Sequence, residues 1–381
     1  MDCCCCKGKV ENVSKLKGLL TLGQSAWLDY IKRTMFSNGE MEQVLADGVM
    51  GMTSNPAIFE AAIAKSADYD AEIKELAAKG LNVQEIYERL VVKDIQMAAD
   101  AFKPVYDATN GVDGFVSLEV SPLLSNDAEG TVKEGLRLFE TVGRPNVMIK
   151  VPATEAGYKA VEDLTALGVN VNATLIFGLE HYRRTALAYI NGLEKLAANG
   201  PAAKNGAAIN KIASVASFFV SRVDSAVDKL LEAQDRKDLC GKVAIANSRL
   251  AYAMSAQIFT GSRWQELAGK GARIQRLLWA STSTKNPAYP DTLYVDELIG
   301  HDTVNTIPPA TLTAFMDHGT LAETITKDIA QAQKDVDVLE TLGIDLDEIT
   351  EKLQADGVKA FEDSFISLEK SIETKRAAIA G

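Results

Sequence analysis

The run PNVMIKVPAT (residues 145–154) places one lysine, Lys150, among aliphatic residues that favour a β-strand. Strand alternation puts Met148 and Lys150 on one face and three aliphatic residues on the other. If both faces are covered, as in a parallel sheet, the lysine is buried. Burial disfavours the charged form of lysine, and a neutral amine can attack a carbonyl carbon. Taken alone, the run favours a more ordinary alternative, a lysine in solvent on an edge strand.

Short β-rich runs alternate with helical stretches along the chain, a pattern typical of βα units and a parallel sheet. Eight strands with intervening helices predict an α/β fold, a (β/α)8 TIM barrel with additional C-terminal helices. The eight runs are Gln24–Tyr30, Gly48–Asn55, Gly114–Ser121, the run that contains Lys150, Val169–Phe177, Lys211–Phe219, Arg276–Ser281 and Thr303–Ile307.

The domain organisation follows from this alternation, since no low-complexity linker divides the chain. We assign residues 1–23 to an N-terminal tail and lead-in, and residues 24–381 to a single barrel domain that includes a C-terminal helical appendage. The longer helices that we expect are Ala57–Ala78, Val83–Ala108, more than one helix across Val223–Thr260, Leu321–Leu342 and Asp347–Ala378.

The composition restricts the class of protein. Of 381 residues, 47% are hydrophobic, a share that suits a globular enzyme, and the formal net charge is −12. This charge argues against nucleic acid or an anionic membrane as the main partner. We see no apolar run long enough to span a bilayer and no signal-peptide pattern, so we expect a cytoplasmic protein.

The cysteines and histidines do not form a pattern typical of a metal site. Four of the five cysteines are consecutive, Cys3–Cys6, and adjacent residues cannot all direct sulfur at one ion. We expect a reduced N-terminal tail there. Three histidines, His181, His301 and His318, are too scattered for a metal centre or a Ser/His triad. We therefore expect no metal.

Polar side chains gather near the carboxyl ends of several predicted strands, where barrel enzymes carry their catalytic groups. An antiparallel sheet with one face in water would explain any single strand of this kind equally well. Because helices must cover the outside of a barrel, we expect the polar set to lie inside its mouth, around Lys150. The grouped residues are Ser25, Trp27 and Asp29; Gly51, Thr53 and Asn55; Ser117, Glu119 and Ser121; Asn170, Asn172 and Thr174; and Ser217 with Arg222.

Several motifs, in this order and spacing, resemble those of the transaldolase family. They are GMTSNPAIF (51–59), VSLEVSPLLS (116–125), MIKVPAT (148–154), VNATLIF (171–177) and SFFVSRVD (217–224). The stretch WASTSTKNPAYPDTLYVDELIG (279–300) looks like a longer bacterial or plant-type subgroup. The resemblance covers the chain from about Gln24 to at least Pro309.

The resemblance implies a class I, Schiff-base transferase of the pentose phosphate pathway without cofactor or metal. It would transfer dihydroxyacetone from sedoheptulose 7-phosphate to glyceraldehyde 3-phosphate, giving erythrose 4-phosphate and fructose 6-phosphate. We expect sugar-phosphate substrates and a monomer or homodimer. One alternative is a fructose 6-phosphate aldolase-like enzyme, but those chains are much shorter and lack a glutamate at the position of Glu119. Another is a non-catalytic sugar-phosphate-binding barrel.

The resemblance also implies roles for individual residues. Lys150 would form the imine, Glu119 would act as general acid/base through a water held with Thr174, and Asp29 would take the C4 hydroxyl proton. The pattern SAWLDYIKR around Asp29 departs from the commoner family pattern. The residues expected to bind the substrate hydroxyls are Asn55, Thr53, Asn172 and Ser217.

The phosphate site is expected after the sixth and seventh strands. Arg222 can hold phosphate oxygens at two points. The commoner family pattern has a second arginine where this chain has ASTSTKN, so Lys285 takes that place, with Ser281 and Ser283 as candidate hydroxyl donors. A solvated loop lysine is the alternative for Lys285.

The C-terminal helix carries apolar side chains at helical spacing, among them Phe361 and Phe365. We expect them to pack in the core across the barrel. Shielding of the barrel mouth by this helix is the weaker hypothesis.

Overall fold

Lys150 lies in the fourth of eight parallel strands that close into a barrel in the computed structural model, which describes residues 14–199 and 208–380. The strands are ordered β1 to β8, and β8 pairs with β1. The predicted (β/α)8 TIM barrel with additional C-terminal helices is therefore confirmed. The strands are β1 (Gln24–Asp29), β2 (Gly51–Thr53), β3 (Val116–Glu119), β4 (Val147–Pro152), β5 (Val171–Ile176), β6 (Ser214–Phe219), β7 (Gln275–Ala280) and β8 (Thr303–Ile307).

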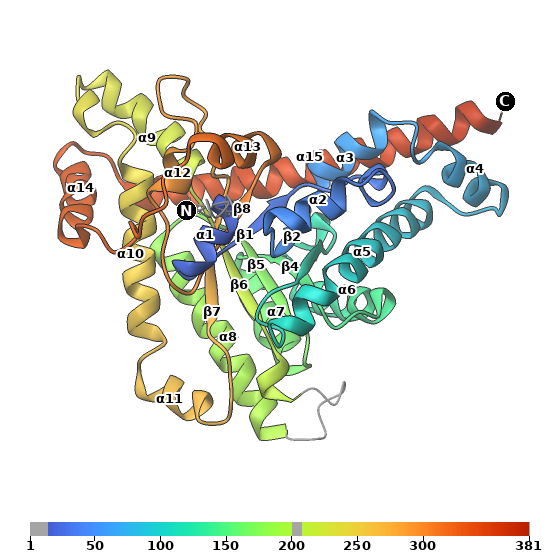
Figure 1. The fold of residues 1–381 in the computed structure, drawn as a ribbon, viewed down its shortest axis with the longest axis horizontal. Helices are drawn as coiled ribbons and strands as arrows, with labels where there is room; N and C mark the ends of the chain where they lie inside the picture. Colours follow the sequence, from blue (N-terminus) through green and yellow to red (C-terminus); the bar gives the residue numbers. More distant parts are fainter. Residues whose placement is uncertain (1–13, 200–207, 381) are drawn as a thin grey trace, which may run out of the picture.

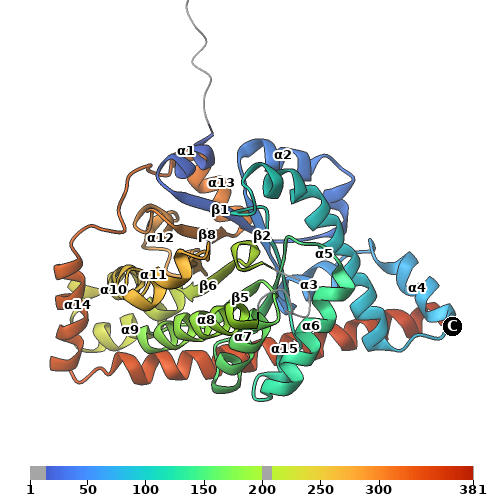
Figure 2. The ribbon, with the colours of Figure 1, turned by 90° about the horizontal axis from the view of Figure 1, so that it is seen from below.

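Helices surround the barrel, and several 3₁₀ turns join the elements (Figures 1 and 2). The α-helices are α1 (Lys15–Thr21), α2 (Glu40–Asp47), α3 (Pro56–Ala64), α4 (Asp70–Ala78), α5 (Val83–Ala108), α6 (Ala128–Val142), α7 (Glu155–Ala166), α8 (Leu179–Asn199), α9 (Ser221–Ala233), α10 (Val243–Ile258), α11 (Ser262–Ala268), α12 (Leu293–Asp296), α13 (Pro309–His318), α14 (Ile329–Thr341) and α15 (Leu346–Ala380). The 3₁₀ turns are η1 (Arg33–Phe36), η2 (Pro122–Leu124), η4 (Ile209–Lys211) and η5 (Lys237–Leu239).

The strands are buried on both faces, which explains their nearly continuous apolar sequence. The amino-terminal half of the interior is filled by Trp27, which is fully buried and donates its indole N–H to Asp113 at 3.0 Å. Asp113 also accepts from Ser25 and pairs with Arg276 at 2.9 Å. Of the inward residues expected together on the first strand, only Asp29 therefore reaches the opposite, functional end.

The predicted single helix Ala57–Ala78 is wrong, because the structure divides it into α3 and α4. Between them, the Ser66 hydroxyl accepts from the Asp68 amide at 3.0 Å. The fully buried Tyr69 then donates its hydroxyl to Asp94 of α5 at 2.7 Å. This long-range anchor fixes a turn that local helix propensity does not reveal.

The predicted helix Leu321–Leu342 begins later, at Ile329 of α14. Before it, the amides of Thr324 and Ile325 both donate to the Ile299 carbonyl, at 2.9 and 3.0 Å, so this segment is tied to the chain before β8. The helices predicted across Val223–Thr260 are confirmed as α9 and α10. Helices α1 and α13 had no counterpart among the predictions.

Helix α1 belongs to the packed structure although it lies within the predicted lead-in. Leu16 and Leu19 are fully buried in the main hydrophobic core, and Ser14 caps the helix by accepting from the Leu16 amide. The cysteine run Cys3–Cys6 lies outside the described residues. Across residues 14–199 and 208–380, none of the helices has the length and apolar character needed to span a bilayer.

Helix α15 (Leu346–Ala380) covers one end of the barrel. This helix of 35 residues contacts α3, α4, α5, α9, η2 and β5, so it crosses the end where the strands finish. Figure 1 shows its red ribbon extending past α3 toward the carboxyl terminus, and Figure 2 shows it running along the lower edge from α14. The candidate site lies between this helix and the strand ends.

Candidate active site

Lys150 lies inside the barrel and is only 5% exposed, which excludes the edge-strand alternative. In the strand register it stands opposite Glu119 of β3 on one side and Asn172 of β5 on the other. Its Nζ atom donates to the Ser54 carbonyl at 3.0 Å and lies 3.6 Å from Oε2 of Glu119. The amine is therefore held next to a carboxyl group in a largely enclosed space.

A pocket of about 140 Å³ opens above Lys150 at the mouth of the barrel. It brings together nine of the eleven predicted site residues. The other two, Glu119 and Asn172, flank Lys150 on the neighbouring strands but do not line the pocket. The lining residues are Asp29, Thr53, Asn55, Lys150, Thr174, Ser217, Phe219, Arg222, Ala280, Ser281, Ser283, Lys285, Thr306, Pro308 and Phe361.

Glu119 is buried, and burial raises the pKa of its carboxyl group to about 7, against the opposing effect of the Lys150 charge. Neither of its oxygens has a hydrogen-bond partner in the described structure, and the same holds for the buried Oγ1 of Thr174. Buried polar atoms usually have such partners. These three atoms therefore retain hydrogen-bonding capacity for a small molecule between them and the pocket.

Asp29 ends β1 on the other side of the pocket, opposite Thr53 of β2. It accepts from the Thr53 hydroxyl at 2.7 Å, and that hydroxyl lies 2.5 Å from the hydroxyl of Thr306. Burial raises the pKa of Asp29, while Lys150 and the Thr53 hydrogen bond act in the opposite direction. The charge of Lys150 thus acts on two buried carboxyl groups, Asp29 and Glu119, whose pKa values are both raised by burial.

The residues predicted to bind substrate hydroxyls differ in how many of their polar atoms form hydrogen bonds within the protein. Asn172 accepts from the Ser217 hydroxyl at 2.7 Å and donates to the Ser117 hydroxyl at 3.0 Å. The side-chain oxygen Oδ1 of Asn55 accepts from the Ile58 amide and caps α3, as expected for an N-cap asparagine. Asn172 is therefore held within the barrel, whereas the amide nitrogen of Asn55 remains available at the pocket wall.

Two cationic side chains meet at the outer end of the pocket. Arg222 lies in the first turn of α9, and Lys285 lies in the loop after β7, where its Nζ atom donates to Ser283 at 2.7 Å. Burial lowers the pKa of Arg222; partial burial, and then the charge of Arg222, lower the pKa of Lys285. No carboxylate of the described residues lies within 4.0 Å of either cation. Two converging, unneutralised cations favour an anionic ligand.

Ser281 lines the same end of the pocket in an unusual backbone conformation. Its φ angle is 56°, in the left-handed region, and its hydroxyl lies 3.0 Å from that of Ser221. Side chains rarely adopt this conformation, and functional sites are enriched in it. The bond joins the loop that carries Lys285 to the helix that carries Arg222.

The sequence predictions of site residues did not include Thr306 or Phe361, which both line the pocket. Thr306 lies near the end of β8, and the alternation of that strand could have indicated its inward direction. Phe361 lies on α15, with its ring centroid 5.8 Å from Nζ of Lys150. Phe361 was expected as a core residue, and its place beside the lysine depends on how α15 docks.

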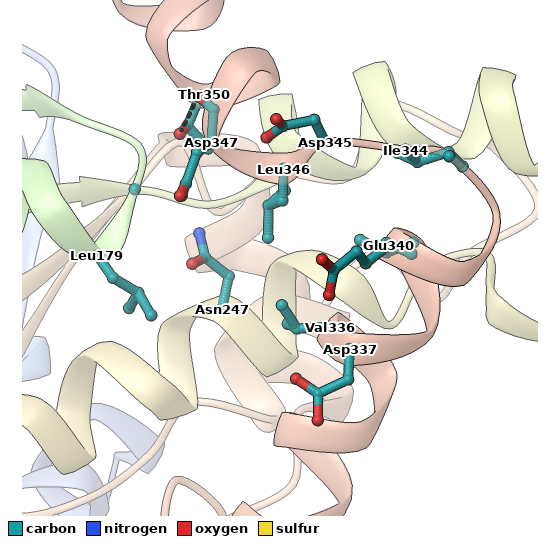
Figure 3. Close-up of a pocket in the computed structure, with 13 residues that line it drawn as sticks. Leu179, Asn247, Val336, Asp337, Glu340, Ile344, Asp345, Leu346, Asp347 and Thr350 are labelled. Carbon is teal, nitrogen blue, oxygen red and sulfur yellow. Dashed lines mark hydrogen bonds between the residues drawn. The ribbon is translucent and has the colours of Figure 1, made fainter.

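A larger hollow of about 520 Å³ lies elsewhere, where α10, α14 and the start of α15 meet (Figure 3). None of the predicted site residues lines it. Its described lining contains Asp337, Glu340, Asp345 and Asp347 but no lysine or arginine. These carboxylates would repel an anionic substrate. Within the residues that the structure describes, no group of three or more histidine, cysteine or acidic side chains has a geometry that could hold a metal ion.

Comparisons with known proteins agree over almost the whole chain. A family model described as Transaldolase/Fructose-6-phosphate aldolase matches residues 26–372. Transaldolase 2 of Nostoc punctiforme is 46% identical over 368 residues, covering 93% of this chain and 95% of that protein. Transaldolase of Trichodesmium erythraeum is 46% identical over 372 residues, covering 93% and 95%, and transaldolase 1 of Streptomyces avermitilis is 46% identical over 369 residues, covering 96% of each.

Proposed function

The chain belongs to the transaldolase/fructose-6-phosphate aldolase family, and from this premise we propose that it is a transaldolase that acts through a Schiff base on Lys150. The proposed reaction transfers dihydroxyacetone from sedoheptulose 7-phosphate to glyceraldehyde 3-phosphate. The observation that carries the proposal is the buried Lys150, 3.6 Å from Glu119 beneath a pocket that has two cations at its outer end.

The first half of the reaction begins when Nζ of Lys150 attacks C2 of the ketose and water is lost, forming an iminium ion. The iminium withdraws electrons, so that the C3–C4 bond breaks as the C4 hydroxyl loses its proton. The aldose phosphate product leaves, and the three-carbon unit stays on Lys150 as an enamine. In the second half, the enamine carbon attacks the aldehyde carbon of the acceptor, and hydrolysis of the new imine frees the ketose and the lysine.

Proton transfers at the imine nitrogen and C2 are assigned to Glu119, through a water held with Thr174. Its pKa of about 7 suits a group that both donates and accepts protons near neutral pH. A bridging water would also satisfy the polar atoms of both residues that lack partners. Asp29 is assigned to the C4 hydroxyl proton, since it lines the pocket with Lys150 and its pKa is raised by burial.

Substrate binding is assigned to the remaining lining residues. Asn55 and Thr53 would bind hydroxyls of the three-carbon unit, while Asn172 and Ser217 support them from within the barrel. Arg222, Lys285 and Ser281 would bind the phosphate group. The pentose phosphate pathway, a cytoplasmic location and a monomeric or homodimeric state are also proposed and rest on the family resemblance alone.

Two alternative functions account for fewer of these observations than a transaldolase does. A fructose 6-phosphate aldolase-like enzyme would release free dihydroxyacetone, but the relatives that match over more than nine tenths of this chain are named transaldolases. A non-catalytic sugar-phosphate-binding barrel has no need for a buried amine whose charge acts on two buried carboxyl groups.

The test is reductive trapping. The protein is incubated with fructose 6-phosphate and borohydride, and the adduct is located by peptide mass mapping. We expect a dihydroxyacetone-derived adduct on Lys150, together with transfer to erythrose 4-phosphate. The absence of an adduct, or an adduct on another lysine, would refute the Schiff-base assignment.

A further inference from the structure

Phe361 contacts the candidate site from α15, a helix that lies far from Lys150 in the sequence. Its side chain is only 6% exposed and forms part of the pocket wall, and its ring centroid is 5.8 Å from Nζ of Lys150. Other apolar residues of this helix, such as Ile372, are fully buried against the surrounding helices and are not among the pocket lining. The position of Phe361 thus differs from ordinary core packing.

Gln354 fixes α15 in this position, two turns before Phe361. Its side chain is 9% exposed, and its Nε2 atom donates to the carbonyls of Ala153 at 2.9 Å and Leu175 at 3.0 Å. Ala153 directly follows β4, the strand of Lys150, and Leu175 directly follows Thr174 on β5. One side chain therefore ties the helix to the ends of both strands that carry the proposed imine and water sites.

Leu175, whose carbonyl accepts one of the Gln354 hydrogen bonds, has an unusual backbone conformation. The pairing of β5 with β6 shifts register between Ala173 and Ile176, and Leu175 has a φ angle of 59°, in the left-handed region. Leucine adopts this conformation only where its surroundings hold it. Burial of an amide side chain costs free energy unless it is hydrogen-bonded, so Gln354 is explained by these two bonds rather than by packing alone.

Further contacts hold the helix along its length. Before Gln354, Glu351 pairs with the buried His181 of α8 at 3.0 Å; beyond Phe361, Ser367 donates to Glu60 of α3 at 2.5 Å. Side-chain contacts therefore hold α15 in place on both sides of Phe361, and they fix the position of its ring in the pocket wall.

In the proposed reaction, the enamine on Lys150 can react further in two ways. Its enamine carbon can form a C–C bond with an acceptor aldehyde, which is transfer. Alternatively, the enamine carbon takes a proton, water adds to C2 of the resulting iminium and the C–N bond breaks. This second route releases dihydroxyacetone and restores the Lys150 amine. The family name covers enzymes of both kinds, so some feature of each site must select between the two outcomes.

We propose that Phe361 is a specificity-determining residue that favours transfer by excluding bulk water from the three-carbon unit on Lys150, and that Gln354 is its positioning residue. The ring covers the approach to Lys150 from α15, and an aromatic face within about 6 Å also stabilises a neighbouring cation. This inference rests on the proposed transaldolase function.

The experiment measures how the bound three-carbon unit is partitioned. Fructose 6-phosphate is supplied with erythrose 4-phosphate, and free dihydroxyacetone and sedoheptulose 7-phosphate are quantified for the wild type and each variant. We expect Phe361→Ala to raise the ratio of release to transfer by about tenfold, equivalent to a change of about 1.4 kcal/mol in relative barriers. Phe361→Leu, which keeps most of the apolar volume, should restore much of the wild-type ratio. Gln354→Leu should shift the ratio in the same direction as Phe361→Ala, but less.

Ile372→Ala is the matched control, because it removes a fully buried apolar side chain from the same helix away from the pocket. It should lower the melting temperature without changing the ratio. An unchanged ratio in Phe361→Ala would overturn the inference. Should the alanine variant not fold, an unchanged ratio in Gln354→Leu would overturn it instead. A wild-type protein that transfers nothing would instead refute the proposed function, so the two failures are distinguishable.

Discussion

Lys150 and Glu119 stand directly opposite each other on β4 and β3, with Nζ of the lysine 3.6 Å from Oε2 of the glutamate. Both side chains are buried, and their separation exceeds that of a direct hydrogen bond. An amine and a carboxyl group at this spacing can exchange protons through a small intervening molecule without being locked into a permanent ion pair.

Replacement of Lys150 by methionine should abolish reductive trapping while preserving the fold. Methionine keeps an unbranched apolar stem but has no amine. The Ser54 carbonyl loses its donor, at a cost of about 1–3 kcal/mol, and the raised pKa of Glu119 lets its carboxyl group stay protonated without the cation. Intact mass after borohydride treatment reports the adduct, and circular dichroism reports the fold. A folded variant that still gains the adduct would show that the nucleophile is elsewhere.

Glu119→Gln should slow turnover by about 10²-fold to 10⁴-fold, the usual contribution of a positioned acid or base. The amide keeps the shape of the carboxyl group but cannot transfer the proton, so substrate binding should be retained. Steady-state kcat and KM, with trapping as a measure of imine formation, separate the two effects. Near-normal turnover would remove the proton-transfer role from Glu119.

The stability of the protein should depend on pH through Glu119. Its pKa is raised from 4.5 to about 7 in the folded state, so the fold favours the protonated carboxyl group. This contribution is fully present below about pH 4.5 and is lost as the pH rises through about 7. The free energy of unfolding of the wild type, relative to Glu119→Gln, should therefore fall by at most about 3 kcal/mol between pH 5 and pH 8. Urea unfolding at several pH values measures this difference, and a constant difference would contradict the raised pKa.

Lys285→Ala should raise KM for glyceraldehyde 3-phosphate by about tenfold and leave KM for unphosphorylated glyceraldehyde unchanged. A single charged contact to phosphate contributes roughly this much binding free energy, about 1.5 kcal/mol. Arg222→Ala should have a larger effect, because its guanidinium can hold two phosphate oxygens and is more deeply buried.

Lys229→Ala on the outer surface of α9 provides the control for loss of a positive charge nearby. Both KM values should remain unchanged in this variant. If wild type and Lys285→Ala have the same KM for glyceraldehyde 3-phosphate, Lys285 does not bind the phosphate and is a solvated loop lysine.

Much of the fold could be predicted because its signals are local. The apolar runs of the strands and the intervening helical stretches lie within single segments of sequence, and they led to the correct barrel. Where the prediction of an element was wrong, a distant partner was responsible. Tyr69 breaks the predicted helix Ala57–Ala78 by bonding to Asp94, and the segment before Ile329 is tied to Ile299.

Local sequence patterns were enough to assign Lys150 to a strand of a (β/α)8 barrel with its side chain inside, and to assign Glu119, Asp29 and Thr174 to other strands of that barrel. Strand alternation and the ordered motifs suffice for this, because side-chain direction along a strand is set locally. The distance between Lys150 and Glu119, and the place of Phe361 in the pocket wall, became known from the folded structure alone. These relationships depend on strand register in the closed barrel and on the docking of α15 through Gln354. Register and docking are fixed by packing and hydrogen bonds between segments far apart in the chain, which no local pattern encodes.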